Sequence, residues 1–163
     1  MQFWIKSIGA SRSLLDDEWL TEKNIGVGGL AASPRLAERV HFPRKKKPTA
    51  AEIDDRFLLY GITKLGGRII GAGIFKSEPE LEDRREELLL RGPEDVDEWP
   101  WRIDIEMLIS IWHAEKGPQL DAIGWEPREM SQHSHRHLTD EQYRDGVLAL
   151  AKRALPPGMA DGD

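Results

Sequence analysis

Two apolar segments joined by a glycine-containing turn constrain the fold of this chain more than any other feature. Residues 56–64 (RFLLYGITK) and residues 68–76 (RIIGAGIFK) both have the composition of buried strands. Residues 65–67 (LGG) between them favour a tight turn, so the two segments are predicted to pair as an antiparallel hairpin. The small residues at 71–73 indicate a bulge, or a close approach of another backbone or a ligand.

The other elements predicted from the sequence belong to the same kind of fold. Residues 2–8 (QFWIKSI) predict a short strand, and residues 101–111 alternate like a strand at their start. Residues 130–138 also alternate with period two, and a capping box of Thr139 and Gln142 then predicts a helix. Short helices are also expected at residues 14–20 and 81–90. Strands joined by hairpins favour an α+β fold, a small curved sheet or barrel with peripheral helices. We expect one domain over residues 1–154 and a flexible tail over residues 155–163.

Composition excludes several classes of function. The 23 Lys and Arg residues against 29 Asp and Glu residues give a net charge of -6, which argues against a general nucleic-acid coat. The absence of cysteine removes disulfides, thiol nucleophiles and cysteine zinc sites. No apolar run is long enough for a membrane span, so we expect a cytoplasmic protein without a membrane partner. Charge is uneven, since residues 43–48 (PRKKKP) form a basic loop and residues 77–98 are strongly acidic.

Six tryptophans are the compositional oddity of the chain. A surplus of indoles suggests a dense core or a stacking site. We expect Trp4, Trp19 and Trp112 to pack in the core. Trp99 and Trp101 are candidates for the wall of a base-binding cage, and Trp125 is a candidate lid.

The order of several motifs resembles the EVE domain, a PUA-like β-barrel family related to the YTH domain. These motifs are residues 2–8, the NIGV segment at 24–27, the hairpin ending in SEP at 77–79, WPWR at 99–102, and LTDEQY at 138–143. The resemblance covers roughly residues 2–150 and implies a small mixed PUA-like barrel. It also implies a module that holds one nucleobase, often a modified one, in an aromatic cage. Gly28 stands where the related YTH domains carry a cage tryptophan.

The resemblance makes this chain a predicted non-catalytic reader of methylated or hydroxymethylated bases in DNA, with RNA as the second choice and without a cofactor. A restriction or toxin system is a possible protein partner. Lys6 and Ser7 match family positions, and Arg44, Lys45, Lys46 and Lys47 are the candidates for phosphate contacts. The full set of candidate base-binding residues is Lys6, Ser7, Asn24, Gly26, Gly28, Trp99, Trp101, Trp125, Ser134 and Arg136.

An alternative function rests on three histidines. His133, His135 and His137 alternate, so a strand would place them on one face. A small PUA-like hydrolase or nuclease could use this cluster, with or without a metal. Same-face strand residues lie ~7 Å apart, which strains convergence on one tetrahedral ion. We therefore expect no metal, exposed histidines, and Ser134 and Arg136 on the opposite face.

Overall fold

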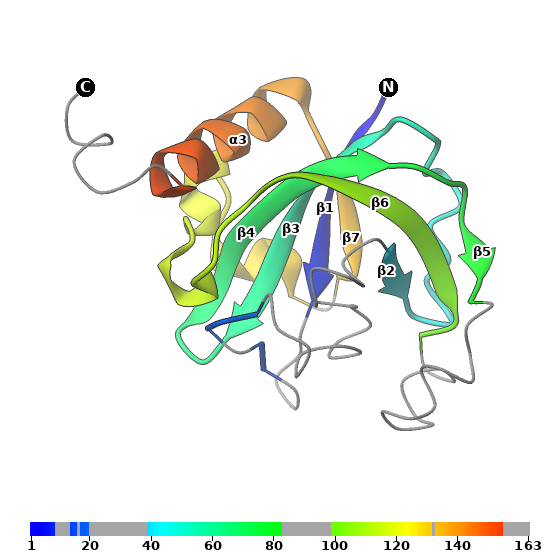
Figure 1. The fold of residues 1–163 in the computed structure, drawn as a ribbon, viewed down its shortest axis with the longest axis horizontal. Helices are drawn as coiled ribbons and strands as arrows, with labels where there is room; N and C mark the ends of the chain where they lie inside the picture. Colours follow the sequence, from blue (N-terminus) through cyan, green and yellow to red (C-terminus); the bar gives the residue numbers. More distant parts are fainter. Residues whose placement is uncertain (9–13, 16, 20–38, 83–98, 132, 155–163) are drawn as a thin grey trace.

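A curled mixed sheet with one long helix forms the fold of the computed structural model (Figure 1). The structure describes residues 1–8, 14–15, 17–19, 39–82, 99–131 and 133–154. The strands are β1 (Phe3–Ile8), β2 (Arg39–Phe42), β3 (Arg56–Thr63), β4 (Gly66–Phe75), β5 (Glu80–Leu81), β6 (Trp101–Ser110) and β7 (His135–Leu138). The helices are the 3-10 turns η2 (Ala114–Lys116), η3 (Leu120–Ile123) and η4 (Pro127–Met130), and the α-helix α3 (Asp140–Ala154).

The strand order of the sheet is β2-β6-β4-β3-β1-β7, with β5 paired to β6. β1 runs parallel to β3 and antiparallel to β7, and every other pairing is antiparallel. The sheet curls into a half-barrel (Figure 1). This confirms the predicted α+β fold, a small curved sheet with a peripheral helix. The barrel stays open, because β2 and β7 do not pair with each other within the described residues.

The predicted hairpin is confirmed as β3 and β4, with Thr63 paired to Gly66. Gly66 has φ 100°, a left-handed conformation that glycine adopts without strain. The predicted bulge is also present, because the register between β4 and β6 shifts between Ala72 and Gly73. A Cβ on Gly73 would lie 2.5 Å from the Glu106 carbonyl oxygen, so only glycine lets the two backbones approach this closely.

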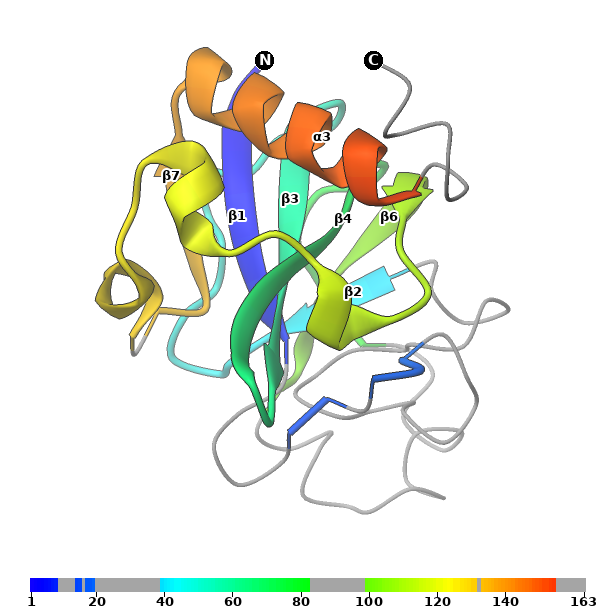
Figure 2. The same ribbon diagram turned by 90° about the vertical axis from the view of Figure 1, so that its left-hand side faces the viewer.

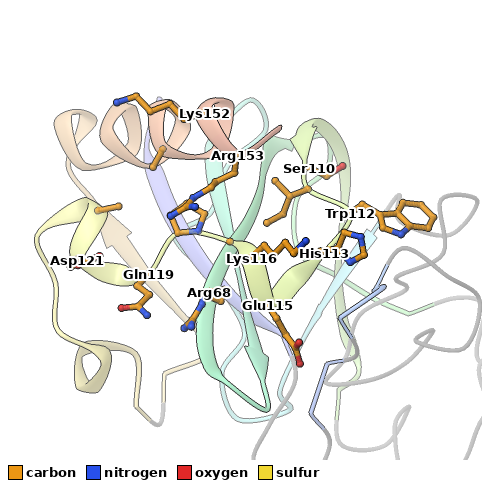
Figure 3. A pocket seen from close by; sticks show the side chains of 15 residues that line it. Arg68, Ser110, Trp112, His113, Glu115, Lys116, Gln119, Asp121, Lys152 and Arg153 are labelled. Carbon is orange, nitrogen blue, oxygen red and sulfur yellow. The ribbon is translucent and has the colours of Figure 1, made fainter. Parts of the chain in front are cut away.

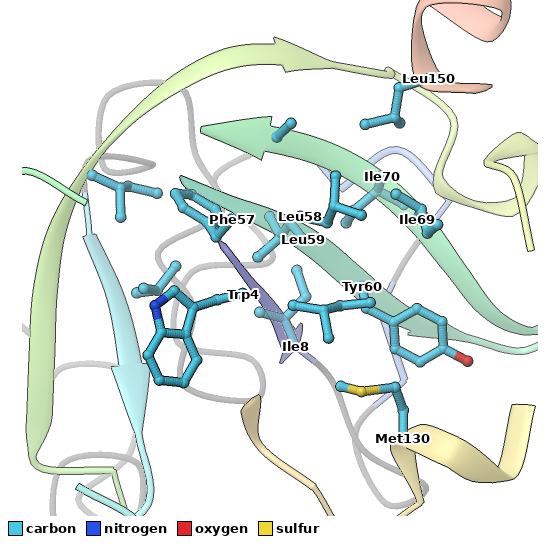
Figure 4. Close-up of a cluster of buried hydrophobic side chains, with 14 of the residues drawn as sticks. Trp4, Ile8, Phe57, Leu58, Leu59, Tyr60, Ile69, Ile70, Met130 and Leu150 are labelled. Atoms are coloured by element: carbon cyan, nitrogen blue, oxygen red, sulfur yellow. The ribbon is translucent and has the colours of Figure 1, made fainter. Parts of the chain in front are cut away.

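Buried apolar side chains pack on both faces of the sheet, since Leu58 lies against Gly146 of helix α3 and its neighbour Phe57 points to the other face (Figure 4). Trp4 is 3% exposed, as predicted, and its indole Nε1 donates to Asp55 Oδ2 at 2.9 Å. Trp19 is also buried as predicted, and it donates to the Ile111 carbonyl at 2.7 Å. Helix α3 crosses the sheet near β1, β3 and β4, and it buries Leu150 (Figure 2).

The capping box is confirmed. Thr139 Oγ1 accepts from the Gln142 backbone N–H at 3.1 Å, and Gln142 Oε1 accepts from the Thr139 backbone N–H at 2.9 Å. Both bonds satisfy donors that the first turn of α3 leaves without intrahelical partners. Within the described residues, no helix combines the length and apolarity that crossing a membrane requires.

Three expectations need correction or fall outside the described residues. Trp112 is 50% exposed and does not belong to the core. Trp112 lies two residues after the end of β6 and next to the buried Ile111. Because neighbouring residues of an extended chain point to opposite sides, the Trp112 indole points away from the core. The helix expected at 14–20 is replaced, where described, by an isolated bridge from Glu18 to His113. The helix expected at 81–90 lies almost wholly outside the described residues, and Leu81 ends β5.

Candidate nucleic-acid interface

A buried lysine surrounded by aromatic rings is the most unusual feature of the half-barrel. Lys6 is 0% exposed, and its Nζ donates to the Ser7 carbonyl at 2.7 Å. The same Nζ lies 4.7 Å from the ring centroid of Phe42 and 5.2 Å from the ring centroid of Trp99. The His135 ring meets Phe42 edge to face, with centroids 5.1 Å apart. We call Lys6, Phe42, Trp99 and His135 the Lys6 cluster.

The β-sheet register explains why these side chains meet. Lys6 of β1 pairs with His135 of β7, so the two side chains lie on the same face of the sheet. Trp4 pairs with His137 on that face, and their rings lie 3.7 Å apart. The edge strand β2 brings Phe42 toward β1 across the open side of the half-barrel. The two edge strands of the curled sheet, β2 and β7, therefore supply Phe42 and His135 to the cluster.

Burial sets the charge of the cluster. Burial, and after it the positive charge of Lys46, lower the pKa of the Lys6 amine from 10.5 to about 7. The pKa of His135 falls from 6.5 to about 4, first because of burial and then because of the charges of Lys6 and Lys46. His135 is therefore neutral near pH 7, and Lys6 is close to half protonated.

One polar atom of the cluster, and one on the residue that precedes it in the chain, have no hydrogen-bond partner among the described residues. His135 Nδ1 and Ser134 Oγ are buried, and neither has a hydrogen-bond partner in the described part of the chain. A buried polar atom without a partner costs about 1–3 kcal/mol. A ligand with suitable donors and acceptors would recover that free energy.

The basic loop lies next to the Lys6 cluster. Its residues 44–47 follow β2 and are all exposed. The loop begins directly after Phe42, which belongs to the cluster. Lys47 Nζ lies 4.4 Å from the ring centroid of Trp101, whose Nε1 donates to the Arg44 carbonyl at 3.2 Å. Trp101 therefore packs against the basic loop, whereas Trp99 belongs to the Lys6 cluster.

Other predicted residues lie on the opposite face of β1 and β7. Arg136 pairs with Ile5 in register, and its guanidinium lies 4.5 Å from the Trp125 ring centroid. Arg136 Nη1 also donates to the Glu129 carbonyl and carboxylate, each at 2.9 Å. Ser7 Oγ donates to the carbonyls of His133 and Ser134, at 3.0 and 3.2 Å.

The predicted cage residues thus lie in separate places. Trp99, Trp101 and Trp125 are half-buried, and each faces a different cation. No two of the described indoles pack ring to ring. Asn24, Gly26 and Gly28 lie outside the described residues.

The three histidines have different environments. His133 precedes β7 and is exposed, His135 is half-buried in the Lys6 cluster, and His137 is exposed and covers Trp4. The expectation that all three are exposed is wrong for His135, because the curl of the sheet brings Phe42 over it. Among the described side chains, no group of three His, Asp or Glu residues could hold a metal ion.

Phe42 and His135 are the cluster residues that sequence reasoning missed. Arg39–Phe42 forms the edge strand β2 directly before the basic loop, and this strand was not predicted from the sequence. The sequence RVHF carries a signal for that strand, since it combines a β-branched residue with an aromatic one. No sequence pattern shows that the edge formed by β2 curls back toward β1.

Several solved structures share this fold. A hypothetical protein from Leishmania major aligns with a TM-score of 0.56 and 7% identity, over 93% of this chain and 96% of that chain. The NMR structure of Rpa0253 from Rhodopseudomonas palustris aligns with a TM-score of 0.51 and 15% identity, over 93% and 94%. Human THYN1, in complex with 5-methylcytosine containing DNA, aligns with a TM-score of 0.46 and 14% identity, over 96% and 100%.

Sequence comparison adds no relative. No family model matches the chain, and no curated protein matches it. The structures from Leishmania major and Rhodopseudomonas palustris, at 7% and 15% identity, show a shared fold alone.

Proposed function

We propose that this chain is a non-catalytic reader that binds one modified base of DNA at the Lys6 cluster. The observation that carries the proposal is a buried amine beside two aromatic rings, next to a basic loop. The motif order of the EVE resemblance supports the same conclusion. A base held outside its helix needs flat apolar faces and donors directed at its edge, and the cluster contains both.

Each member of the Lys6 cluster has a role in this proposal. Phe42 and Trp99 supply faces on which a base stacks. Lys6 donates to an acceptor on the Watson–Crick edge, in place of the Ser7 carbonyl that it now contacts. The unpartnered Nδ1 of His135 supplies a second polar contact. Because Lys6 is wholly buried, the base reaches it when the Trp99 ring moves aside.

The free energy of extruding a base and the free energy of stacking it on the cluster are of comparable size. Extrusion of a base from a duplex costs a few kcal/mol. Stacking on aromatic side chains returns about 1–3 kcal/mol per base. The balance is close, so phosphate contacts have to contribute to the affinity. The exposed basic loop at residues 44–47 lies where the backbone beside an extruded base would run.

Fluorescence anisotropy with short duplexes tests the proposal. One duplex carries a central 5-methylcytosine, a second carries 5-hydroxymethylcytosine, a third carries N6-methyladenine, and matched duplexes are unmodified. We expect the chain to bind at least one modified duplex more tightly than its unmodified match. Trp99→Ala is expected to weaken that binding about 5- to 150-fold, the effect of one lost stacking contact. Lys47→Glu is expected to weaken binding to all duplexes equally and to reduce its dependence on salt.

Control variants separate a binding defect from a folding defect. Trp112→Ala removes an exposed indole that does not belong to the Lys6 cluster, and it should preserve the preference for the modified duplex. Equal affinity of the wild-type chain for modified and unmodified duplexes would refute the reading of a modification. An unchanged affinity of Trp99→Ala, with an unchanged melting temperature, would refute the Lys6 cluster as the site.

A further inference from the structure

A second group of residues combines an exposed indole with clustered cations. An open hollow of ≈ 1170 Å³ lies between helix α3 and the segment that follows β6. Trp112 lies at its rim, and Arg153 descends toward it from α3 (Figure 3). Four cations and two carboxylates line the hollow: Arg68, Lys116, Lys152, Arg153, Glu115 and Asp121. This local excess of positive charge occurs in a chain whose net charge is -6.

Trp112 lies outside the core and exposes half of its side chain to water. Its side chain is 50% exposed, while the neighbouring Ile111 is buried in the core. No other aromatic ring packs against Trp112 among the described residues. A half-exposed indole presents a flat apolar face to water, at a cost that a stacked ring would remove.

The cations that line the hollow are available to a ligand. Lys152 and Arg153 are exposed, and neither forms an ion pair with another described residue. Arg68 donates to the Gly67 carbonyl at 3.0 Å, which leaves other guanidinium donors unused in the described structure. The Nδ1 atom of His113 lies 2.7 Å from Oδ2 of Asp17, so the carboxylate of Asp17 already has a hydrogen-bond partner.

We propose that this hollow binds an unpaired stretch of nucleic acid, with one base stacked on Trp112 and the phosphates on Arg153, Lys116 and Arg68. Stacking on an indole beside cations that follow the backbone is how proteins bind single strands without reading sequence. An acidic polypeptide would use the cations but not the indole, so the nucleic acid is the better match.

This inference does not depend on the proposed function at the Lys6 cluster. The two sites share no residue, so each can fail without the other. A strand that is unmodified and unpaired tests the hollow, because it offers no modified base and requires no base extrusion.

Fluorescence anisotropy with fluorescein-labelled oligothymidylate and oligouridylate of eight nucleotides tests this proposal. Trp112→Ala is expected to weaken binding about 5- to 150-fold, while Trp112→Phe keeps most of the affinity because it retains a ring. Arg153→Glu should weaken binding and reduce its dependence on salt. Leu148→Ala, which shortens an exposed apolar side chain on α3, should bind like the wild type.

Three outcomes would overturn the proposal. The first is no binding of either oligonucleotide to the wild-type chain. The second is unchanged affinity of Trp112→Ala. The third is displacement of the oligonucleotide by polyglutamate at an equal concentration of charge, which would identify the hollow as a surface for acidic polypeptides.

Discussion

Replacement of Lys6 by Met should change how the stability of the fold depends on pH. The folded state lowers the pKa of Lys6 from 10.5 to about 7, first through burial and then through Lys46. A fall of this size corresponds to roughly 5 kcal/mol of free energy that opposes folding with a charged amine. Met has a similar length and no charge, so it fills the same space without this penalty.

The direction of this pH dependence is set by the number of protons that the folded and unfolded states bind. Below about pH 7, Lys6 is protonated in both states, and the folded state carries the whole penalty. Between about 7 and 10.5 the unfolded state holds the proton and the folded state does not, so this term raises stability as pH rises. Above 10.5 both states are neutral and the penalty is gone. The stability advantage of Lys6→Met is therefore largest at acidic to neutral pH, and it shrinks by up to about 1.4 kcal/mol per pH unit above 7.

Urea denaturation of the wild type and Lys6→Met from pH 6 to pH 9 measures this difference. Lys64→Met is the matched control, because Lys64 is exposed in the turn between β3 and β4. Its curve should run parallel to that of the wild type. A pH-independent difference between Lys6→Met and the wild type would show that the folded state does not perturb Lys6, and the reasoning on burial would fail.

Three further substitutions test the fold by the same denaturation assay. Gly73→Ala places a Cβ 2.5 Å from the Glu106 carbonyl, and we expect a loss of about 1–3 kcal/mol or more; a loss below 0.5 kcal/mol would contradict the close approach. Thr139→Ala removes one half of the capping box and should cost about 1 kcal/mol; an unchanged midpoint would mean that the cap is not formed. Asp55→Asn replaces a carboxylate that accepts from the Trp4 indole and three other donors, and it should cost about 1.5–3 kcal/mol; wild-type stability would show that the carboxylate does not organise this corner.

The local elements could be predicted because each carries its signal in a few neighbouring residues. The hairpin of β3 and β4 follows from two apolar segments and a glycine turn, and the start of α3 follows from Thr139 and Gln142. Both depend on short-range chemistry. Trp112 was wrongly placed in the core. Alternation shows whether Ile111 or Trp112 points inward only once the end of β6 is known.

The Lys6 cluster could not be predicted as a whole, because it depends on contacts between distant segments. Lys6 was a candidate from the resemblance, yet nothing in its own segment shows that it is buried. The pairing of β1 with β7 brings His135 beside it, and the curl of the sheet brings Phe42 over both. These contacts join residues that are 36 or more positions apart in the chain.

The cost of burying Lys6 is itself an argument about function. Position 6 lies on the face of β1 that also carries Trp4 and Ile8, both of them buried apolar residues. A Met or Leu would continue that face without an unfavourable charge term of roughly 5 kcal/mol. A buried amine beside Phe42 and Trp99 therefore contributes less to packing than an apolar residue would. What it offers is a hydrogen-bond donor inside an aromatic environment, and under the proposed function the acceptor on a base replaces the Ser7 carbonyl that this donor now contacts.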